Sequence, residues 1–270
     1  MAFVIRSGET YKFLYGMETT FGTALALSGT GYKQIEFEIG QFPDLGINKT
    51  SLNQNRSSRL FSLVDSYHDN FSGPVVLPFT TYCSKDRVAD FIYLVTQNRV
   101  SQGAATAYQK VYRMNSSQPD FTANGGAFAT LILDSPETGK DMRFTSGILR
   151  DLTITWDKSG IGEATLVKMS GTFLFKKYEV DQTFSGSGTA RDITLAYNVK
   201  DFDLAVTFGA GLLSDVNWSR FSLALNNNAI GIDRDSSGNL VTYFLNPADS
   251  LRASCELWYT GSYVNAITDY

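Results

Sequence analysis

The stretch DLTITWDKSGIGEATLVKMSGTFLFK, residues 151–176, decides the fold class of this 270-residue chain. Leu152, Ile154 and Trp156 alternate with threonines, which is the period of a β-strand with one apolar and one polar face. Residues 157–162 then supply the Asp, Ser and Gly of a turn, and the remainder of the stretch alternates again. The stretch therefore predicts a long β-hairpin.

Composition extends this prediction to the whole chain. Aromatic residues make up 13%, with 19 Phe and 14 Tyr, whereas charged residues make up only 19%. Such a balance favours pleated, half-buried strands over solvent-exposed helices. Hydrophobic residues reach 43%, which is enough to build a core. We expect an all-β fold of the sandwich or barrel type.

Other segments share the alternating pattern. They predict strands at 35–39, 75–80, 128–133, 193–199, 202–208 and 221–225, and a last hairpin that joins 241–245 to 251–259. One segment has helical spacing instead, because Val88, Phe91, Ile92 and Val95 recur at i, i+3, i+4 and i+7. With the preceding serine as its cap, this segment predicts a single flanking helix over about 85–97, packed on a sheet face.

Two kinds of segment lack this order. Residues 1–31 are rich in glycine and small side chains, and they predict an extended N-terminal arm suited to order against a neighbouring copy. Residues 32–270 then form a single β-sandwich domain with insertions. Residues 98–106 and 185–189 are polar or Gly-rich and predict exposed loops.

Charge and cysteine content exclude some classes of function. The formal net charge is −4 and no basic stripe is visible, so we expect no tight nucleic-acid binding, which depends on Lys and Arg contacts to phosphate. Residues 1–13 show no secretory signal, and no apolar run has the length of a membrane span, so we expect no membrane partner. Cys83 and Cys255 are therefore expected to be small buried thiols rather than a disulfide.

Nucleophilic catalysis is not expected. His68 is the only histidine and thus the only candidate histidine base, with Asp65 and Asp69 as candidate orienting groups. No G-x-S-x-G elbow supplies a nucleophile, and Gly186-Ser187-Gly188 has the wrong spacing. We interpret His68 as a polar loop residue and predict that the chain is not an enzyme. A hydrolase whose carboxylates meet only in space is the remaining catalytic alternative.

Two segments imitate ligand-binding loops without completing them. Residues 233–238, DRDSSG, follow the start of a calcium-binding loop, but the twelfth position is Phe244, where a bidentate carboxylate is needed. We interpret this segment as a hairpin turn between 230–232 and 240–245. Residues 138–141, TGKD, lack the hydroxyl residue and the upstream glycine of a phosphate loop. We predict no metal and no cofactor.

Three parts of the chain carry a family resemblance. Residues 15–23 read YGMETTFGT, which fits the pattern G-x-E-x-x-F/Y-G-T. Residues 145–173 contain G-x-x-x-x-L-x-I in a first strand and S-G-x-F in a second. Residues 221–227 and 249–257 then supply a strand that ends in Asn and a late strand. In this order and spacing, the stretches resemble the tail tube proteins, or major tail proteins, of long-tailed bacteriophages.

The resemblance implies a virion protein with a β-sandwich and one flanking helix, which forms rings of six that stack into the tail tube. Its implied partners are itself, the tape measure protein, the tail terminator and the baseplate or distal tail proteins. DNA would pass through the lumen without specific binding, and assembly would occur in the host cytoplasm. A weakly acidic, Lys-poor lumen suits such passage. The candidates for the lumen lining are Glu36, Glu38 and Thr153.

The alternative hypothesis is a receptor-binding or glycan-binding tail component, such as an adhesin or a distal tail protein. Aromatic residues near the end of the chain would then act as a sugar platform, with Trp218, Trp258 and Tyr259 as the candidates. The chain is longer than the simplest tube proteins, and residues 98–106 are one candidate for an added decoration or an inter-ring contact.

Overall fold

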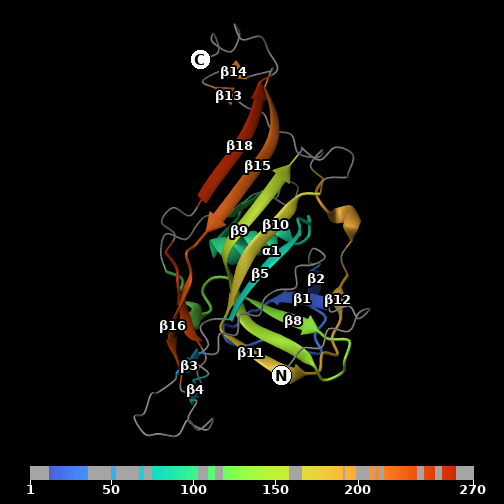
Figure 1. Ribbon diagram of the computed structural model, residues 1–270, viewed down its shortest axis with the longest axis vertical. Coiled ribbons are helices and arrows are strands. Elements are labelled where there is room, and N and C mark those ends of the chain that lie inside the picture. The colour runs from blue at the N-terminus through green and yellow to red at the C-terminus, as the bar shows by residue number, and fades with distance from the viewer. Residues whose placement is uncertain are drawn as a thin grey trace, which may run out of the picture.

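The computed structural model describes residues 12–35, 50–52, 67–69, 75–102, 109–112, 118–157, 166–190, 192–198, 207–208, 211–212, 216–235, 240–246 and 251–259. Within these residues the protein is mostly β-sheet with one α-helix, which confirms the mostly-β prediction (Figure 1). Ten of the described strands form one mixed sheet, and eight others form two-stranded ribbons.

The large sheet contains β1 (Lys12–Met17), β2 (Tyr32–Ile35), β5 (Val75–Tyr82), β8 (Ala129–Asp134), β9 (Asp141–Asp157), β10 (Lys168–Phe175), β11 (Lys177–Gln182), β12 (Gly188–Thr189), β15 (Val216–Asn226) and β18 (Leu251–Tyr259). The ribbons pair β3 (Thr50–Leu52) with β4 (Tyr67–Asp69), β6 (Arg99–Gln102) with β7 (Gln109–Tyr112), β13 (Thr207–Phe208) with β14 (Gly211–Leu212), and β16 (Ile230–Arg234) with β17 (Leu240–Phe244). The described helical elements are α1 (Val88–Thr96) and two short 3-10 turns at Phe121–Ala123 and Ile193–Leu195.

The long strand β9 belongs to both parts of the large sheet. As far as Gly147 it pairs with β8 and β11, and it then pairs with β10 from Ile148 and with β15 from Asp151. The first half-sheet has the strand order β12-β2-β1-β8-β9-β11, and the second half-sheet has the order β5-β10-β9-β15-β18. Figure 1 shows the first half-sheet in the lower part of the molecule and the second in the upper part. The predicted hairpin of residues 151–176 is the β9–β10 pair, which confirms that prediction.

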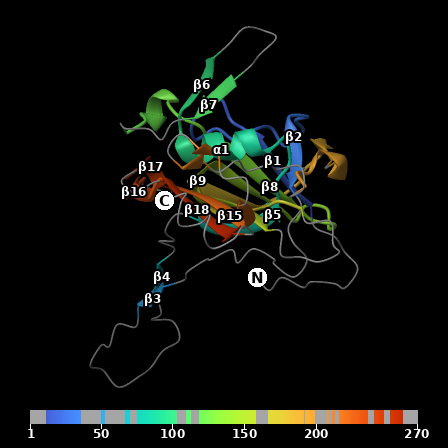
Figure 2. The same ribbon diagram turned by 90° about the horizontal axis from the view of Figure 1, so that it is seen from above.

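Both half-sheets share one core with α1. Leu152 and Ile154 of β9 are buried on the face toward the helix, and α1 contributes Phe91, Leu94 and Val95, which have no exposed surface. Figure 2 shows α1 lying along one side of the sheet. Each such side chain contributes roughly 1.5–3 kcal/mol by leaving water. The predicted apolar stripe therefore does pack on a sheet face.

The helix lies inside the predicted range 85–97. It begins at Val88, whose N–H donates to the carbonyl oxygen of Ser84 at 2.9 Å. The expected cap is displaced, because the N-cap position is Arg87 and the hydroxyl of Ser84 donates instead to the carboxylate of Asp86. A turn thus precedes the first helical residue.

The first strands correct the predicted arm over residues 1–31. β1 is an inner strand that pairs with β2 on one side and with β8 on the other, and Phe13, Leu14 and Tyr15 are buried. Residues 185–189 are not entirely a loop either, because β12 pairs in parallel with β2. A short apolar segment between glycines is enough to form this strand, because β2 and β8 pair with both edges of β1. Residues 1–11 lie outside the described residues.

Three later predictions need correction. The segment 98–106 contributes β6 to the β6–β7 ribbon instead of forming only a loop. The segment 193–199 forms a 3-10 turn followed by isolated bridges at Ala196 and Asn198. β17 and β18 do not form a hairpin, because β17 pairs with β16 and β18 pairs with β15. Alternation predicts a strand but does not name its partner. Outside the described residues lie 103–106, 36–39 and 202–206.

Gly147 stands where β9 passes from one half-sheet to the other, and a Cβ there would overlap the ring of Phe175. We expect Gly147→Ala to lower the free energy of unfolding by about 1–3 kcal/mol, because the core must shift to admit the methyl group. Gly31→Ala is the matched control, since a Cβ there meets nothing within 4 Å, and it should change stability by less than about 0.5 kcal/mol. Urea unfolding measures both. Equal effects of the two substitutions would contradict this account of the bend.

Candidate functional site

A buried carboxylate holds the bend of β9. Oε1 of Glu18 accepts the N–H of Ser146 at 2.8 Å and the hydroxyl of Thr130 at 2.6 Å, and Oε2 accepts the hydroxyl of Ser146 at 2.6 Å. The hydroxyl oxygen of Ser146 in turn accepts the N–H of Gly22 at 2.7 Å. Ser146 has φ 53°, a left-handed conformation that costs a non-glycine residue about 1–2 kcal/mol. Four hydrogen bonds therefore stabilise an unfavourable backbone conformation at the bend.

Tyr243 of β17 closes the other side of the bend. Its hydroxyl oxygen lies 2.7 Å from the carbonyl oxygen of Ser146 and 3.0 Å from that of Leu174. Burial, and then the charge of Glu18, raises the pKa of Tyr243 well above its ordinary value. The turn after β1 and the β16–β17 ribbon are thus both hydrogen-bonded to Ser146 at the bend in β9.

The environment of Glu18 opposes its charge. Burial raises the pKa of Glu18 above 4.5, although the hydrogen bonds from Ser146 and Thr130 and the charge of Lys177 act in the opposite direction. Glu18 is 8% exposed, so water supplies little of the missing stabilisation. In the sequence, Glu18 is the acidic residue of the pattern G-x-E-x-x-F/Y-G-T, but no role for its side chain was predicted.

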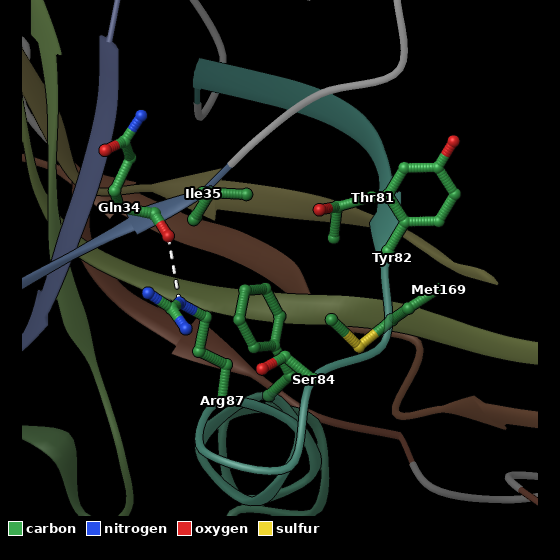
Figure 3. A pocket seen from close by; sticks show the side chains of 8 residues that line it. Gln34, Ile35, Thr81, Tyr82, Ser84, Arg87 and Met169 are labelled. Atoms are coloured by element: carbon green, nitrogen blue, oxygen red, sulfur yellow. Dashed lines mark hydrogen bonds between the residues drawn. The ribbon is translucent and has the colours of Figure 1, made fainter. Parts of the chain in front are cut away.

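Arg87 joins the start of α1 to the first half-sheet. Its Nε donates to the backbone oxygen of Gln34 at 2.9 Å, as drawn in Figure 3, and its Nη2 lies 3.2 and 3.3 Å from the backbone oxygens of Thr189 and Ala190. Asp86 pairs with Nη1 at 2.5 Å. The hollow beside these groups measures about 10 Å³, so it admits one water molecule at most. This arrangement is structural rather than a substrate site.

A second polar cluster ties β1 and β2 to α1. Asp90 accepts the hydroxyl of Tyr15 at 3.0 Å and pairs with Nζ of Lys33 at 2.6 Å. Burial, and then the charge of Asp90, raises the pKa of Tyr15 well above its ordinary value. Tyr15 therefore remains a donor, and the cluster fixes the helix to the sheet.

The second half-sheet has a polar face opposite α1. Thr153 of β9 pairs with Ser170 and Ala224, and Thr155 pairs with Lys168 and with a serine of β15. All of these side chains are partly or fully exposed. The polar face, as used below, consists of Thr80, Thr153, Thr155, Lys168, Ser170, Thr172, Ser222 and Ala224. Apart from Lys168, the polar face therefore consists of small side chains, most of which carry a hydroxyl group.

The charges around the polar face nearly balance. A β-bulge opposite Thr172 inserts Arg150 into β9, and its Nε lies 3.0 Å from Oδ2 of Asp151. At the other end, exposed Arg220 stands opposite Asp157 in the register. On β18, Arg252 pairs with Ala224 and Glu256 pairs with Arg220, so both positions belong to this face. With Lys168, this makes four cationic and three anionic residues on or beside the face. The acidic surface predicted for a lumen is therefore not evident in the described part of this face.

The structure describes only one of the three residues predicted to line the lumen. Thr153 lies at the centre of the polar face, with Ser170 and Ala224 on its two sides. Glu36 and Glu38 lie outside the described residues.

The structure describes two of the three candidate catalytic residues, which are consecutive in β4. In the β3–β4 ribbon, His68 pairs with Ser51 and Asp69 pairs with Thr50. His68 therefore belongs to a strand rather than to the predicted loop. Asp65 lies outside the described residues.

The two strands predicted to flank the turn at 233–238 do pair, because β16 and β17 are antiparallel, but β16 extends as far as Arg234. Asp233 is exposed with φ 56°, and residues 236–239 lie outside the described part. Among the described residues, no group of three or more His, Cys, Asp or Glu is placed to hold a metal ion. Cys83 is a free, buried thiol, and burial raises its pKa to about 12.

The pairing of β15 with β18 separates the aromatic residues that were candidates for a sugar platform. Trp218 pairs with Leu257, whereas Trp258 pairs with Asn217, so the two tryptophans occupy positions on opposite faces of the β15–β18 ladder. Tyr259 pairs with Val216 and shares the parity of Trp218. The three residues therefore do not occupy one continuous face.

No known protein-family model matches the sequence, and no curated protein matches it at a significant level. The resemblance to tail tube proteins thus stays a prediction. In the described part of the chain, no helix has the length and apolar character needed to cross a membrane.

Because burial raises the pKa of Glu18, folding favours its protonated form. That contribution to stability is fully present below the ordinary pKa of 4.5 and is lost as the pH rises through the higher pKa of the folded state. We expect the neutral variant Glu18→Gln to lose less unfolding free energy than the natural protein as the pH rises from 4.5. Urea unfolding over a pH series tests this, with Glu137→Gln on an exposed turn as the control. Parallel curves for the natural protein and Glu18→Gln would refute it.

Proposed function

We propose that this chain is a tail tube protein of a long-tailed bacteriophage. It is a non-enzymatic structural protein that self-assembles into stacked hexameric rings, and the tube conducts DNA during ejection. The observation that carries the proposal is the second half-sheet, in which one face packs on α1 and the other is partly exposed and rich in hydroxyls. In a ring, this polar face would line the lumen, and the helix on the other side of the sheet would lie on the outside of the ring.

The chemistry of the polar face suits the passage of DNA. Proteins hold DNA chiefly by neutralising phosphates with Lys and Arg, which releases counterions. Here Arg150 is paired with Asp151, Arg220 stands opposite Asp157 and Glu256, and Lys168 and Arg252 are two further cations. The cations on or beside the face therefore exceed the anions by only one. Ser and Thr hydroxyls supply hydrogen-bonding groups without a fixed charge. The wall is therefore wetted but weakly attractive, and a sliding polyanion meets little resistance.

The proposed context follows from this role. The subunit functions in the virion tail after assembly in the host cytoplasm. The proposed partners of the tube are the tape measure protein, the tail terminator and the baseplate or distal tail proteins. The alternative of a glycan-binding tail component has less support, because Trp218 and Trp258 occupy opposite faces of their ladder.

Electron microscopy and sedimentation of the concentrated full-length protein test the assembly. We expect rings with six-fold symmetry and open tubes, in equilibrium with smaller species at low concentration, because edge contacts repeat until the ring closes. A protein that stays monomeric at every concentration and salt would overturn the proposal. Discrete trimers that bind glycans would favour the adhesin alternative.

Thiol labelling tests whether the polar face lines the lumen. In a background with Cys255→Ser, we expect Thr153→Cys in tubes to react with a small maleimide but only slowly with a maleimide on a large polyethylene glycol. Val180→Cys is the control, since Val180 is exposed on β11, away from this face. It should react with both reagents. Equal labelling of Thr153→Cys by the large reagent in tubes and in dissociated subunits would show that the face is not luminal.

A further inference from the structure

The edges of the two half-sheets differ in how they are protected. In the first half-sheet, the edge strand β11 carries Lys177, Glu179 and Asp181, and its pairing with β9 becomes irregular after Glu179. The opposite edge, β12, is only two residues long. Charged, irregular or very short edge strands prevent pairing with further strands. The edge strands of the first half-sheet are therefore poorly suited to pair with strands of another copy.

The second half-sheet lacks most of this protection. β18 is nine residues long without Pro or Gly, its charged residues are Arg252 and Glu256, and within the described residues it pairs only with β15. β5 is eight residues long and has no charged residue. Pro78 removes one backbone donor from β5, and within the described residues the strand pairs only with β10. Among the described strands, two long strands of similar length thus form the edges of the half-sheet that carries the polar face.

The number of strands fixes their relative direction. β5, β10, β9, β15 and β18 are each antiparallel to the next, so β5 and β18, separated by four such steps, run in the same direction. Rotation about a ring axis leaves the direction of a strand along that axis unchanged. A contact between β18 of one copy and β5 of the next is therefore a parallel pair. A two-fold contact between two β18 strands would be antiparallel.

We infer that β18 binds β5 of a second copy as a parallel strand pair, and that this pair is the junction at which the half-sheets of neighbouring subunits become continuous. The inference rests on the proposed ring and adds which strands meet and in which direction. The register supports it, because the row through Thr80, Ser170, Thr153 and Ala224 reaches position 252 on β18 and so spans the sheet from one edge to the other. A neighbouring β5 extends both the polar face and the core face without a break.

Disulfide trapping between copies tests the junction. The background carries Cys83→Ala and Cys255→Ala, and each test chain adds one cysteine at Arg252, Ser254 or Glu256 of β18 and one at Val76 or Thr80 of β5. A disulfide requires Cα atoms closer than about 7 Å, whereas four residues of a strand span about 13 Å. Each trapped pair therefore reports the local alignment. Oxidised rings should give a ladder of covalent oligomers on a denaturing gel.

In a parallel junction, the β18 position that links best to Thr80 lies C-terminal to the one that links best to Val76. The reverse order would show an antiparallel junction and overturn the inference. Dimers formed by chains with a single cysteine on β18 would show a two-fold β18 contact and also overturn it. Rings without any trapped pair would overturn the junction but leave the proposed function intact, whereas the absence of rings before oxidation in the background protein would overturn both. Each variant is first checked for rings in reducing buffer, so that misfolding is recognised.

Discussion

The buried carboxylate of Glu18 and the left-handed backbone of Ser146 are the contact on which the architecture depends. β9 belongs to two half-sheets, and the position at which it leaves one and enters the other must be fixed. A serine in that conformation is unfavourable by itself, and the bonds from Glu18 to its N–H and hydroxyl supply the compensation. Because Glu18 directly follows β1, an early strand of the chain sets the bend of a strand more than a hundred residues later.

This bend separates two chemically different surfaces. The first half-sheet ends in a charged edge and a very short one, whereas the second ends in longer strands with few charges. Only the second presents the polar face, with α1 on its opposite side. The proposed tube subunit uses this difference between the half-sheets. The edges of the second half-sheet pair with neighbouring copies, whereas the edges of the first do not.

The polar interior of the described residues is devoted to structure. Glu18, Arg87, Asp90 and Tyr243 each have partners from other elements, and among the described buried side-chain polar atoms only Oγ1 of Thr145 has none. A buried polar group that is fully hydrogen-bonded fixes one arrangement of its neighbours. The small hollow at Arg87 is consistent with that role.

Residue pattern was enough to predict the β9–β10 hairpin, the helix and its buried stripe, because alternation and i, i+3, i+4 spacing are properties of neighbours along the chain. It also placed Thr153 on a polar strand face. Pattern could not show that β1 is an inner strand or that β17 and β18 pair elsewhere, since strand partners are chosen by contacts distant in sequence. The role of Glu18 likewise appeared only with the tertiary structure, because a single acidic residue acquires its hydrogen bonds from Thr130 and Ser146 through folding alone.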